Sequence, residues 1–370
     1  MDRLPVAAPD LGGNEERYVV DAIRSSWISS TGPYVDRFER EFAELAGMRA
    51  AIAVSNGTVA IHLALLALDA GPGDEVIVPS LTYIATANAV RYVGAEPIFV
   101  DVDPATWCLD PAAVDEAVGP ATKAIIAVDL YGHPPDMDPI NDIAKRSGLA
   151  VIEDAAEAHG ARYKGRPAGS LGTIGTFSFY GNKIITSGEG GAVTVDDPEL
   201  ERRLRLFRGQ GMDPERRYYF PVIGYNYRLT NVACALLCAQ LERWNELLGA
   251  RAELFAAYER GLASVRGIAL QPRAAWAEPA RWLFSITVDE SEFGVNRDEL
   301  ARRLDTDGIE TRPFFHPLHR LPPYERRPGS QRELPVTDRL SASGLNLPTS
   351  SRMTDADVGR VVNAIRKVGR

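Results

Sequence analysis

The sequence predicts an α/β protein with a mainly parallel sheet of about seven strands and a smaller α+β unit at its C-terminal side. From about residue 50, short apolar and β-branched runs alternate with amphipathic stretches, which is typical of βα units. After about residue 250 the alternation gives way to a strand-like run at 284–288, a helical pattern at 297–305 and proline-rich turns. Because 370 residues are enough for two units, we expect a large domain at 1–248, which includes the N-terminal segment, and a small domain at 249–370.

Each element of the large domain follows from its local pattern. Seven runs are predicted as strands, at 51–54, 75–78, 97–100, 124–128, 149–152, 176–180 and 192–195. Helical patterns lie between the early runs, at 59–68, 84–92, 111–118 and 139–146, and several are bounded by glycine or proline. Right-handed crossovers would place these helices on both faces of the sheet. A long helix from Asn231 to Leu248, continuing as far as Tyr258 on the widest interpretation, would lead into the second unit.

Composition excludes several classes of protein. With 45% hydrophobic and 25% charged residues, the chain has average globular usage rather than that of a disordered protein. A net charge of -9 gives no general attraction to nucleic acid or anionic lipid. No apolar run is long enough for a membrane helix, the first residues lack a secretory pattern, and three cysteines suit a reducing compartment. We therefore expect a cytoplasmic protein. Cys234 and Cys238 share a helix face, and buried packing is favoured there over metal ligation.

The segment from Val54 to Thr58 follows a predicted strand and opens a predicted helix. Backbone N–H groups and the positive end of the helix dipole would therefore point beyond the strand, as in an anion site. The structural alternative is that Gly57 makes a turn and Thr58 caps the helix.

Asp154 ends a strand that should be central in the sheet, where open α/β sheets bind their ligands. A buried carboxylate needs a cation, a metal or a protonated ring nitrogen beside it. Because no histidine cluster lies nearby, an organic cation is favoured over a metal. The alternative is an N-cap for a helix at 155–158.

Lys183 follows an aromatic-rich, buried-looking strand, and the chain has only five lysines. The other four occupy ordinary solvated positions, at Lys123, Lys145, Lys164 and Lys367. Desolvation would lower the pKa of the Lys183 amine and free it for Schiff-base chemistry. A surface lysine in a loop is the alternative.

Five motifs occur in order along the chain: Ser55-Asn56-Gly57-Thr58, Asp154 with Glu157, Ser178 with Lys183, Gly188-Glu189-Gly190-Gly191 and Gly224-Tyr225-Asn226-Tyr227-Arg228. In order and spacing the sequence resembles the DegT/DnrJ/EryC1/StrS family of pyridoxal-phosphate-dependent sugar aminotransferases over nearly its whole length. The resemblance implies the fold type I aminotransferase architecture, with pyridoxal 5′-phosphate (PLP) as the cofactor.

The resemblance also implies roles for individual residues. Lys183 would bind the cofactor covalently and shuttle a proton, and Asp154 would keep the pyridinium nitrogen protonated. Glu157 stands where many relatives have Gln beside the ring oxygen, so its carboxyl would have to be protonated or share a proton. The remaining cofactor contacts would be Gly57, Thr58 and Ser178 at the phosphate, Tyr83 stacked on the ring, and Asn226 reaching the phosphate from a second subunit.

Substrate contacts are implied at Thr31, Tyr83, Arg228 and His316. For His316 a purely structural role in a proline-rich turn is the alternative. The implied partners are a nucleotide sugar, L-glutamate and a second copy of the chain in a homodimer, with a higher oligomer left open; no metal is implied.

The implied reaction is transfer of the amino group of L-glutamate to a nucleotide-linked 4-keto-6-deoxy sugar. The stretches at 159–191, 208–214 and 344–349 are most similar to members that convert GDP-4-keto-6-deoxymannose to GDP-perosamine. Two alternatives of the same class are a 3-aminotransferase on a dTDP- or GDP-linked sugar and an aminocyclitol aminotransferase. A regulatory protein that keeps the fold without catalysis is the alternative of another class, and the presence of both Lys183 and Asp154 argues against it.

Overall fold

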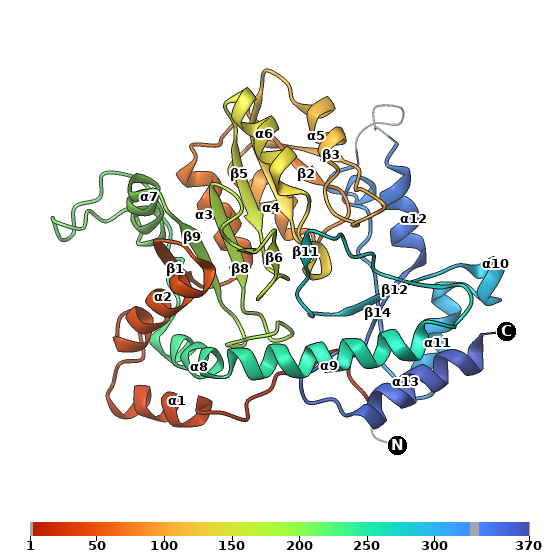
Figure 1. Cartoon of the computed structure of the whole chain (residues 1–370). Coiled ribbons are helices and arrows are strands. Elements are labelled where there is room, and N and C mark those ends of the chain that lie inside the picture. The colour runs from red at the N-terminus through yellow and green to blue at the C-terminus, as the bar shows by residue number, and fades with distance from the viewer. Residues whose placement is uncertain (1–2, 326–332, 370) are drawn as a thin grey trace.

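The computed structural model describes residues 3–325 and 333–369, and a seven-stranded sheet forms its centre (Figure 1). The strand order is β1-β9-β8-β5-β4-β2-β3, and β9 is the one strand of the seven that runs opposite to the other six. The strands are β1 (Ala50–Val54), β2 (Glu75–Pro79), β3 (Glu96–Val100), β4 (Thr122–Val128), β5 (Ala150–Asp154), β8 (Ile174–Ser178) and β9 (Gly191–Val195). The predicted α/β class with a mainly parallel seven-stranded sheet is confirmed.

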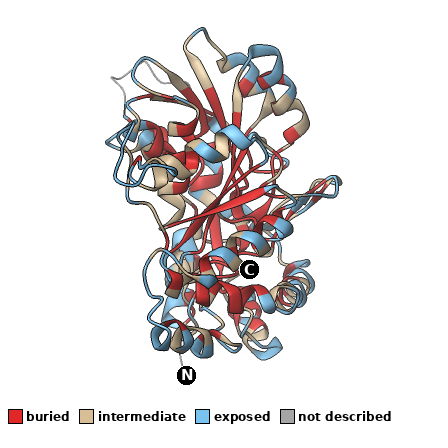
Figure 2. Cartoon of the chain, turned by 90° about the vertical axis from the view of Figure 1, so that its left-hand side faces the viewer, coloured by how far each residue is buried: buried red, intermediate tan, exposed pale blue. Residues whose placement is uncertain are grey.

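Helices cover both faces of this sheet because its strands alternate between two apolar surfaces. Along β4, Ile126 packs into one cluster with α3 and α4, whereas Ile125 and Ala127 pack into another with α5 and α6. Figure 2 shows the strands as buried and the outer helix surfaces as exposed. The helices of this layer are α2 (Pro33–Ala46), α3 (Gly57–Ala67), α4 (Ala85–Tyr92), α5 (Pro111–Ala117), α6 (Met137–Ser147), α7 (Pro198–Arg208) and α8 (Asn231–Glu242).

A four-stranded antiparallel sheet of order β10-β12-β14-β13 forms the second part of the chain. Its strands are β10 (Ile268–Leu270), β12 (Phe284–Val288), β13 (Arg312–Pro313) and β14 (Gly344–Leu347). Its core includes residues of α9, α11 and α13. The helices of this part are α9 (Trp244–Leu262), α10 (Glu290–Phe293), α11 (Arg297–Thr306), α12 (Pro335–Ser343) and α13 (Asp355–Val368). The four-stranded sheet and its helices have a hydrophobic core of their own, which supports a second unit. The domain boundary between residues 248 and 249 stays a prediction.

Small elements connect the two parts. A three-stranded sheet of order β11-β6-β7 pairs β6 (Arg162–Tyr163) with β7 (Arg166–Pro167) and with β11 (Ala277–Glu278). There are two short 3-10 helices. The first, η1 (Leu130–Gly132), follows β4, and the second, η2 (Leu318–Arg320), precedes α12. No helix in the described ranges is long and apolar enough to cross a membrane.

The N-terminal segment contacts both parts of the chain. Leu4 forms a bridge with Ile309 in the second part, and α1 (Glu15–Arg24) packs on α8, where Tyr18 donates a hydrogen bond to Glu242 at 2.5 Å. The expectation of one long helix from Asn231 was wrong, because α8 ends at Glu242 and α9 begins at Trp244. Arg243, at the break, is held by an ion pair with Asp10 at 3.0 Å, a tertiary contact that local sequence cannot reveal.

Candidate active site

Lys183 lies just beyond the carboxyl end of β8, with its amine in a buried site. The Nζ atom is 3.8 Å from Oε1 of Glu157 and 3.9 Å from the centroid of the Trp282 ring. Burial lowers the pKa of the Lys183 amine, while the charges of Glu157 and Asp154 oppose that shift. The surface-loop alternative is therefore wrong, and the amine is in the setting that nucleophilic lysines require.

Asp154 is the last residue of β5, near the middle of the larger sheet, and its side chain is buried. Its Oδ2 accepts a hydrogen bond from Oγ1 of Thr86 at 2.9 Å, and its Oδ1 accepts one from the Ala156 N–H at 3.3 Å. Burial raises the pKa of Asp154, which these two donors and Lys183 counteract. No helix follows at 155–158, so the N-cap alternative was wrong.

Glu157 is also buried, and it connects the lysine to a strained turn. Its Oε2 accepts a hydrogen bond from the Tyr131 N–H at 2.8 Å, and Tyr131 has the left-handed backbone angles φ 51° and ψ 29°. Burial raises the pKa of Glu157 to about 7, against the lowering effect of Lys183. The expectation of a carboxyl that is protonated or shares a proton therefore agrees with its surroundings.

A second pair of acids lies behind Asp154. Both Glu153 oxygens accept backbone N–H bonds, from Gly169 and Leu171 at 2.7 Å each, whereas no donor reaches the buried oxygens of Asp129 within the described residues. Burial, followed by the charge of Glu153, raises the pKa of Asp129 well above its usual range. We infer that Asp129 is protonated and that the pair carries one negative charge.

The N-terminus of α3 opens at the same edge of the sheet. Asn56 is the N-cap residue, since its side chain accepts from the Val59 N–H at 3.0 Å, so the structural alternative with Thr58 as the cap was wrong. Thr58 lies in the first turn instead. A Cβ atom on Gly57 would be 2.8 Å from Cβ of Ser178, so only glycine lets the helix start this close to β8. Backbone donors and the Ser178 hydroxyl thus meet at one place.

A row of aromatic rings lines the approach to Lys183. Tyr83, which is 58% exposed, lies 5.7 Å from Phe315 between ring centroids. Phe315 stacks on Tyr131 at 5.6 Å, and Tyr131 stacks on Trp282 at 6.3 Å. These four rings connect an exposed tyrosine with the ring against the lysine amine, and they draw on segments far apart in the sequence.

The other predicted site residues lie in exposed or half-buried loops. Arg228 donates from Nε to Oγ of Ser30 at 3.0 Å, which brings it next to Thr31 in the chain. Asn226 is exposed and forms a bridge with Gly209, whereas Arg228 forms a bridge with Val54, the last residue of β1. Lys183, Asp154, Glu157, Gly57 and Ser178 therefore lie near one edge of the sheet. The bridge to Val54 brings the backbone of Arg228 to the same edge.

His316 is exposed, and it has no hydrogen bond or ion pair within the described residues. The structural role in the turn belongs to His319 instead, whose buried Nδ1 lies 2.7 Å from Oγ of Ser80. The structural alternative for His316 is therefore disfavoured, and its side chain is free to meet a ligand.

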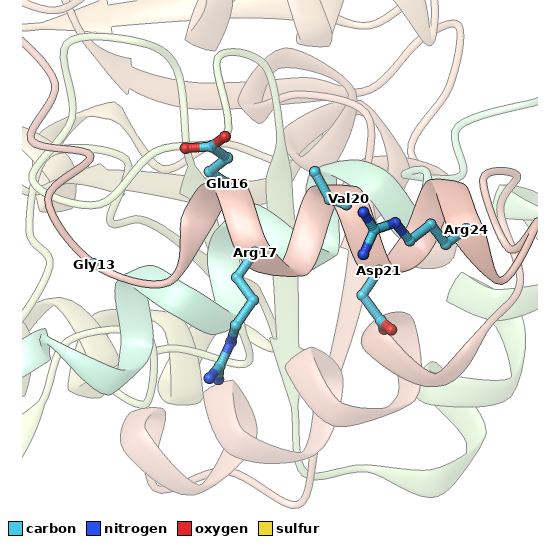
Figure 3. A pocket seen from close by; sticks show the side chains of 6 residues that line it. All are labelled: Gly13, Glu16, Arg17, Val20, Asp21 and Arg24. Carbon is cyan, nitrogen blue, oxygen red and sulfur yellow. The ribbon is translucent and has the colours of Figure 1, made fainter.

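Two surface pockets lie away from the predicted site residues. One lies along α1 with a volume of about 550 Å³, and its walls are charged and small side chains (Figure 3): Gly13, Glu16, Arg17, Val20, Asp21 and Arg24. Another, of about 390 Å³, is lined by residues 164–165 and 273–278. Neither contains a predicted site residue. Across the described part of the chain, no three potential ligand side chains gather as a metal site would require, and all three cysteines are free and buried.

Comparison with known proteins identifies the family. The model of the DegT/DnrJ/EryC1/StrS aminotransferase family matches residues 9–366. The chain belongs to this family. It is 49% identical over 369 residues to the GDP-perosamine synthase of Caulobacter vibrioides, covering 100% of this chain and 99% of that protein.

Solved structures agree with the sequence comparison. DesV of S. venezuelae is 37% identical, with a TM-score of 0.91 over 99% of this chain and 98% of that one. The PLP form of the sugar aminotransferase Spr1654 from Streptococcus pneumoniae, described as putative, is 27% identical, with a TM-score of 0.93 over 99% of this chain and 98% of that one. The chain is thus a PLP-dependent aminotransferase with the expected fold.

The described residues fit PLP. The cofactor needs an amine, a carboxylate for its ring nitrogen and donors for its phosphate, and the structure gathers these as Lys183, Asp154 and the start of α3 beside Ser178. Sequence reasoning missed Thr86, Tyr131 and Trp282. A hydroxyl in the first turn of α4 was a usable signal for Thr86, whereas nothing local points from Trp282 to a lysine 99 positions earlier.

Proposed function

We propose that this enzyme transfers the amino group of L-glutamate to the 4-keto carbon of GDP-4-keto-6-deoxymannose, giving GDP-perosamine. The observation that carries the proposal is 49% identity over the full length to a GDP-perosamine synthase, supported by 43% identity to a second one from Escherichia coli O157:H7. The arrangement of Lys183, Glu157 and Asp154 supports the same chemistry. The reaction consists of two half-turnovers at one site, with 2-oxoglutarate leaving after the first.

When bound, PLP supplies an electron sink for the deprotonated substrate carbon. Lys183 is proposed to hold the cofactor and then to move a proton at the substrate carbon, for which a desolvated amine is suited. Asp154 is proposed to face the ring nitrogen, and Thr86 keeps this carboxylate oriented. Glu157, with a pKa of about 7, can carry the proton that a hydrogen bond to the ring oxygen needs.

The phosphate is proposed to bind at the start of α3. The N–H groups of Gly57 and Thr58 and the Ser178 hydroxyl are the donors there, and the helix dipole adds to their attraction for an anion. Tyr83 is proposed to stack on the cofactor ring and to border the sugar, because it is exposed at the outer end of the aromatic row.

A homodimer is proposed to complete the site. The segment from Gly209 to Arg228 extends outward beside α7 (Figure 1) and exposes a group of large apolar side chains: Met212, Tyr218, Tyr219, Phe220, Val222 and Ile223. Such a group marks an interaction surface. Asn226 lies in the same segment, so a second copy that covers it would receive Asn226 at its phosphate site.

We propose that the enzyme acts in the cytoplasm, where nucleotide sugars are made.

The sugar nucleotide is proposed to contact Thr31, Tyr83, Arg228 and His316. Arg228 supplies the positive charge that a diphosphate needs in an acidic protein, and its bond to Ser30 brings the loop of Thr31 to the same place. His316 has no internal partner within the described ranges, so its ring can bond a sugar or phosphate oxygen.

A panel of keto-sugar nucleotides tests the proposal. Purified enzyme, PLP and L-glutamate are incubated separately with GDP-4-keto-6-deoxymannose and with dTDP-linked 3-keto and 4-keto sugars, and the position of the new amine is found by NMR. We expect the highest kcat/KM with the GDP sugar and an amine at carbon 4. Preference for a dTDP sugar, or an amine at carbon 3, would overturn the choice of substrate while leaving the aminotransferase assignment in place.

A further inference from the structure

The ring of Trp282 is the closest face presented to the Lys183 amine. Its centroid is 3.9 Å from Nζ, well within the distance at which an ammonium ion is attracted to an indole face. The nearest carboxylate oxygen, on Glu157, is 3.8 Å away, which is longer than a hydrogen bond. The lysine amine is therefore held between one carboxylate and one aromatic face rather than in a tight ion pair.

Trp282 itself is fixed on three sides. Its indole Nε1 donates to the carbonyl oxygen of Asn182, the residue before Lys183, at 2.9 Å. Its ring stacks on Tyr131 at an interplanar angle of 20°, and the side chain is 3% exposed. Its own carbonyl oxygen accepts from Nη1 of Arg251 at 2.7 Å. The indole thus has little freedom to turn away from the lysine.

Arg251 is an unusual side chain to find in this place. It comes from α9, is 2% exposed, and forms no ion pair with any carboxylate in the described part of the chain. Burial lowers its pKa to about 10, and its Nε–H has no partner there. Its Nη1 donates to the carbonyl oxygens of Arg281 and Trp282, at 3.2 and 2.7 Å. A buried cation without a counter-ion is costly, and these bonds to two carbonyl oxygens offset part of that cost.

We propose that Trp282 is a positioning residue that holds the Lys183 ammonium ion against its indole face whenever the amine is not bound to the cofactor, and that Arg251 fixes Trp282 in this orientation. The inference rests on the role proposed for Lys183 and adds to it a place for the amine between the two half-reactions. In each turnover the amine is released and must stay within reach, and the indole face provides a dry, oriented position for it.

The titratable groups that face Lys183 are few. Asp154 at the end of β5 and Glu157 just after it favour the ammonium form. Burial lowers the pKa of His159, two residues beyond Glu157, to about 3, so its ring is neutral. A change at Trp282 therefore acts on the amine while these two carboxylates and the neutral His159 stay the same. Loss of the aromatic face removes a stabilising contact of the ammonium ion and makes the amine easier to deprotonate.

Competitive acylation measures this directly. Full-length enzyme loaded with pyridoxamine 5′-phosphate, in which Lys183 is free, is treated with trace acetic anhydride across pH 6 to 11, and acetylated peptides are quantified by mass spectrometry. The other four lysines serve as internal references in the same sample. Trp282→Leu should lower the midpoint for Lys183 by about 0.5 to 1.5 pH units, and Trp282→Phe should lower it less.

Two controls keep the result independent of folding. Trp276→Leu, at a tryptophan that packs on Tyr163 and His133 instead, should leave the midpoint unchanged. Replacement of tryptophan by fluorinated tryptophan keeps the volume while weakening the ring's negative face, and it should lower the midpoint stepwise with fluorine number. A midpoint that is unchanged or raised in both Trp282→Leu and the fluorinated protein would overturn the proposal.

Arg251→Met tests the second part. We expect the Lys183 midpoint to fall in the direction seen for Trp282→Leu, because the indole is no longer held in place. A variant that loses thermal stability but keeps the wild-type midpoint would overturn the role of Arg251. None of these measurements uses a nucleotide sugar or turnover, so failure of the proposed reaction and failure of this inference give different results.

Discussion

Gly57 gives the sharpest prediction about the proposed phosphate site. A Cβ atom added there would be 2.8 Å from Cβ of Ser178, whereas ordinary carbon contacts begin at about 3.4 Å, so helix α3 and strand β8 must separate by about 0.6 Å. Overpacking of this kind costs about 1–3 kcal/mol. Because the same movement separates the helix N–H groups from the Ser178 hydroxyl, we expect Gly57→Ala to weaken PLP binding by about 5- to 150-fold.

The assay is titration of cofactor-free protein with PLP, followed by absorbance, together with thermal unfolding. Gly249→Ala is the matched control, since that glycine lies inside α9 with nothing within 4 Å of an added Cβ. It should raise stability by about 0.5–1 kcal/mol and leave PLP affinity unchanged. Wild-type PLP affinity in Gly57→Ala would refute the reasoning that this contact shapes the proposed phosphate site.

Three further predictions follow from single contacts. Thr86→Val removes a hydrogen bond to the Asp154 carboxylate and should reduce kcat/KM by about 10- to 150-fold, whereas Thr86→Ser should stay within about threefold of wild type; equal losses in both variants would contradict a hydroxyl role. Burial raises the pKa values of Asp129 and Glu153, to about 7 for Glu153, so the folded protein binds more protons than the unfolded chain between about pH 4 and 7, and stability falls as pH rises through that window. The difference in unfolding temperature between Asp129→Asn and wild type should therefore be more favourable to the variant at pH 8 than at pH 4.5. A difference that is the same at both pH values would contradict this. Ile223→Asp changes a side chain that is 88% exposed, so it should leave the fold intact yet convert the proposed dimer to monomer in light scattering, and a dimer in both wild type and variant would exclude this segment from the interface.

The sequence sufficed for the features that are local. Strand and helix patterns in the larger sheet follow from alternation and from glycine and proline boundaries, and they agree with the structure to within a few residues, β8 ending at Ser178 rather than at Tyr180. Lys183 and Asp154 stand out because a lysine after an apolar strand and an acid at the end of a central strand are locally unusual. Their proximity was then a consequence of β5 and β8 being neighbours in the sheet.

Features set by tertiary contacts could not be predicted. The helix break at Arg243 has no glycine or proline to mark it, and the ion pair with Asp10 joins residues 233 positions apart. The sequence could not show that Asn56 rather than Thr58 caps α3, because both side chains suit an N-cap by propensity. The backbone geometry alone decides between them. Trp282 looks like any core tryptophan in its strand-flanking context, and the second sheet must fold against the first before its ring meets Lys183.

The most direct test of the account is to locate the covalent bond to the cofactor. Holoenzyme is reduced with borohydride, digested, and mapped by mass spectrometry for the pyridoxyl group among the five lysines. The account predicts one modified peptide, the one that contains Lys183, and none after the same treatment of Lys183→Ala. A pyridoxyl group on another lysine, or full turnover by Lys183→Ala, would contradict it.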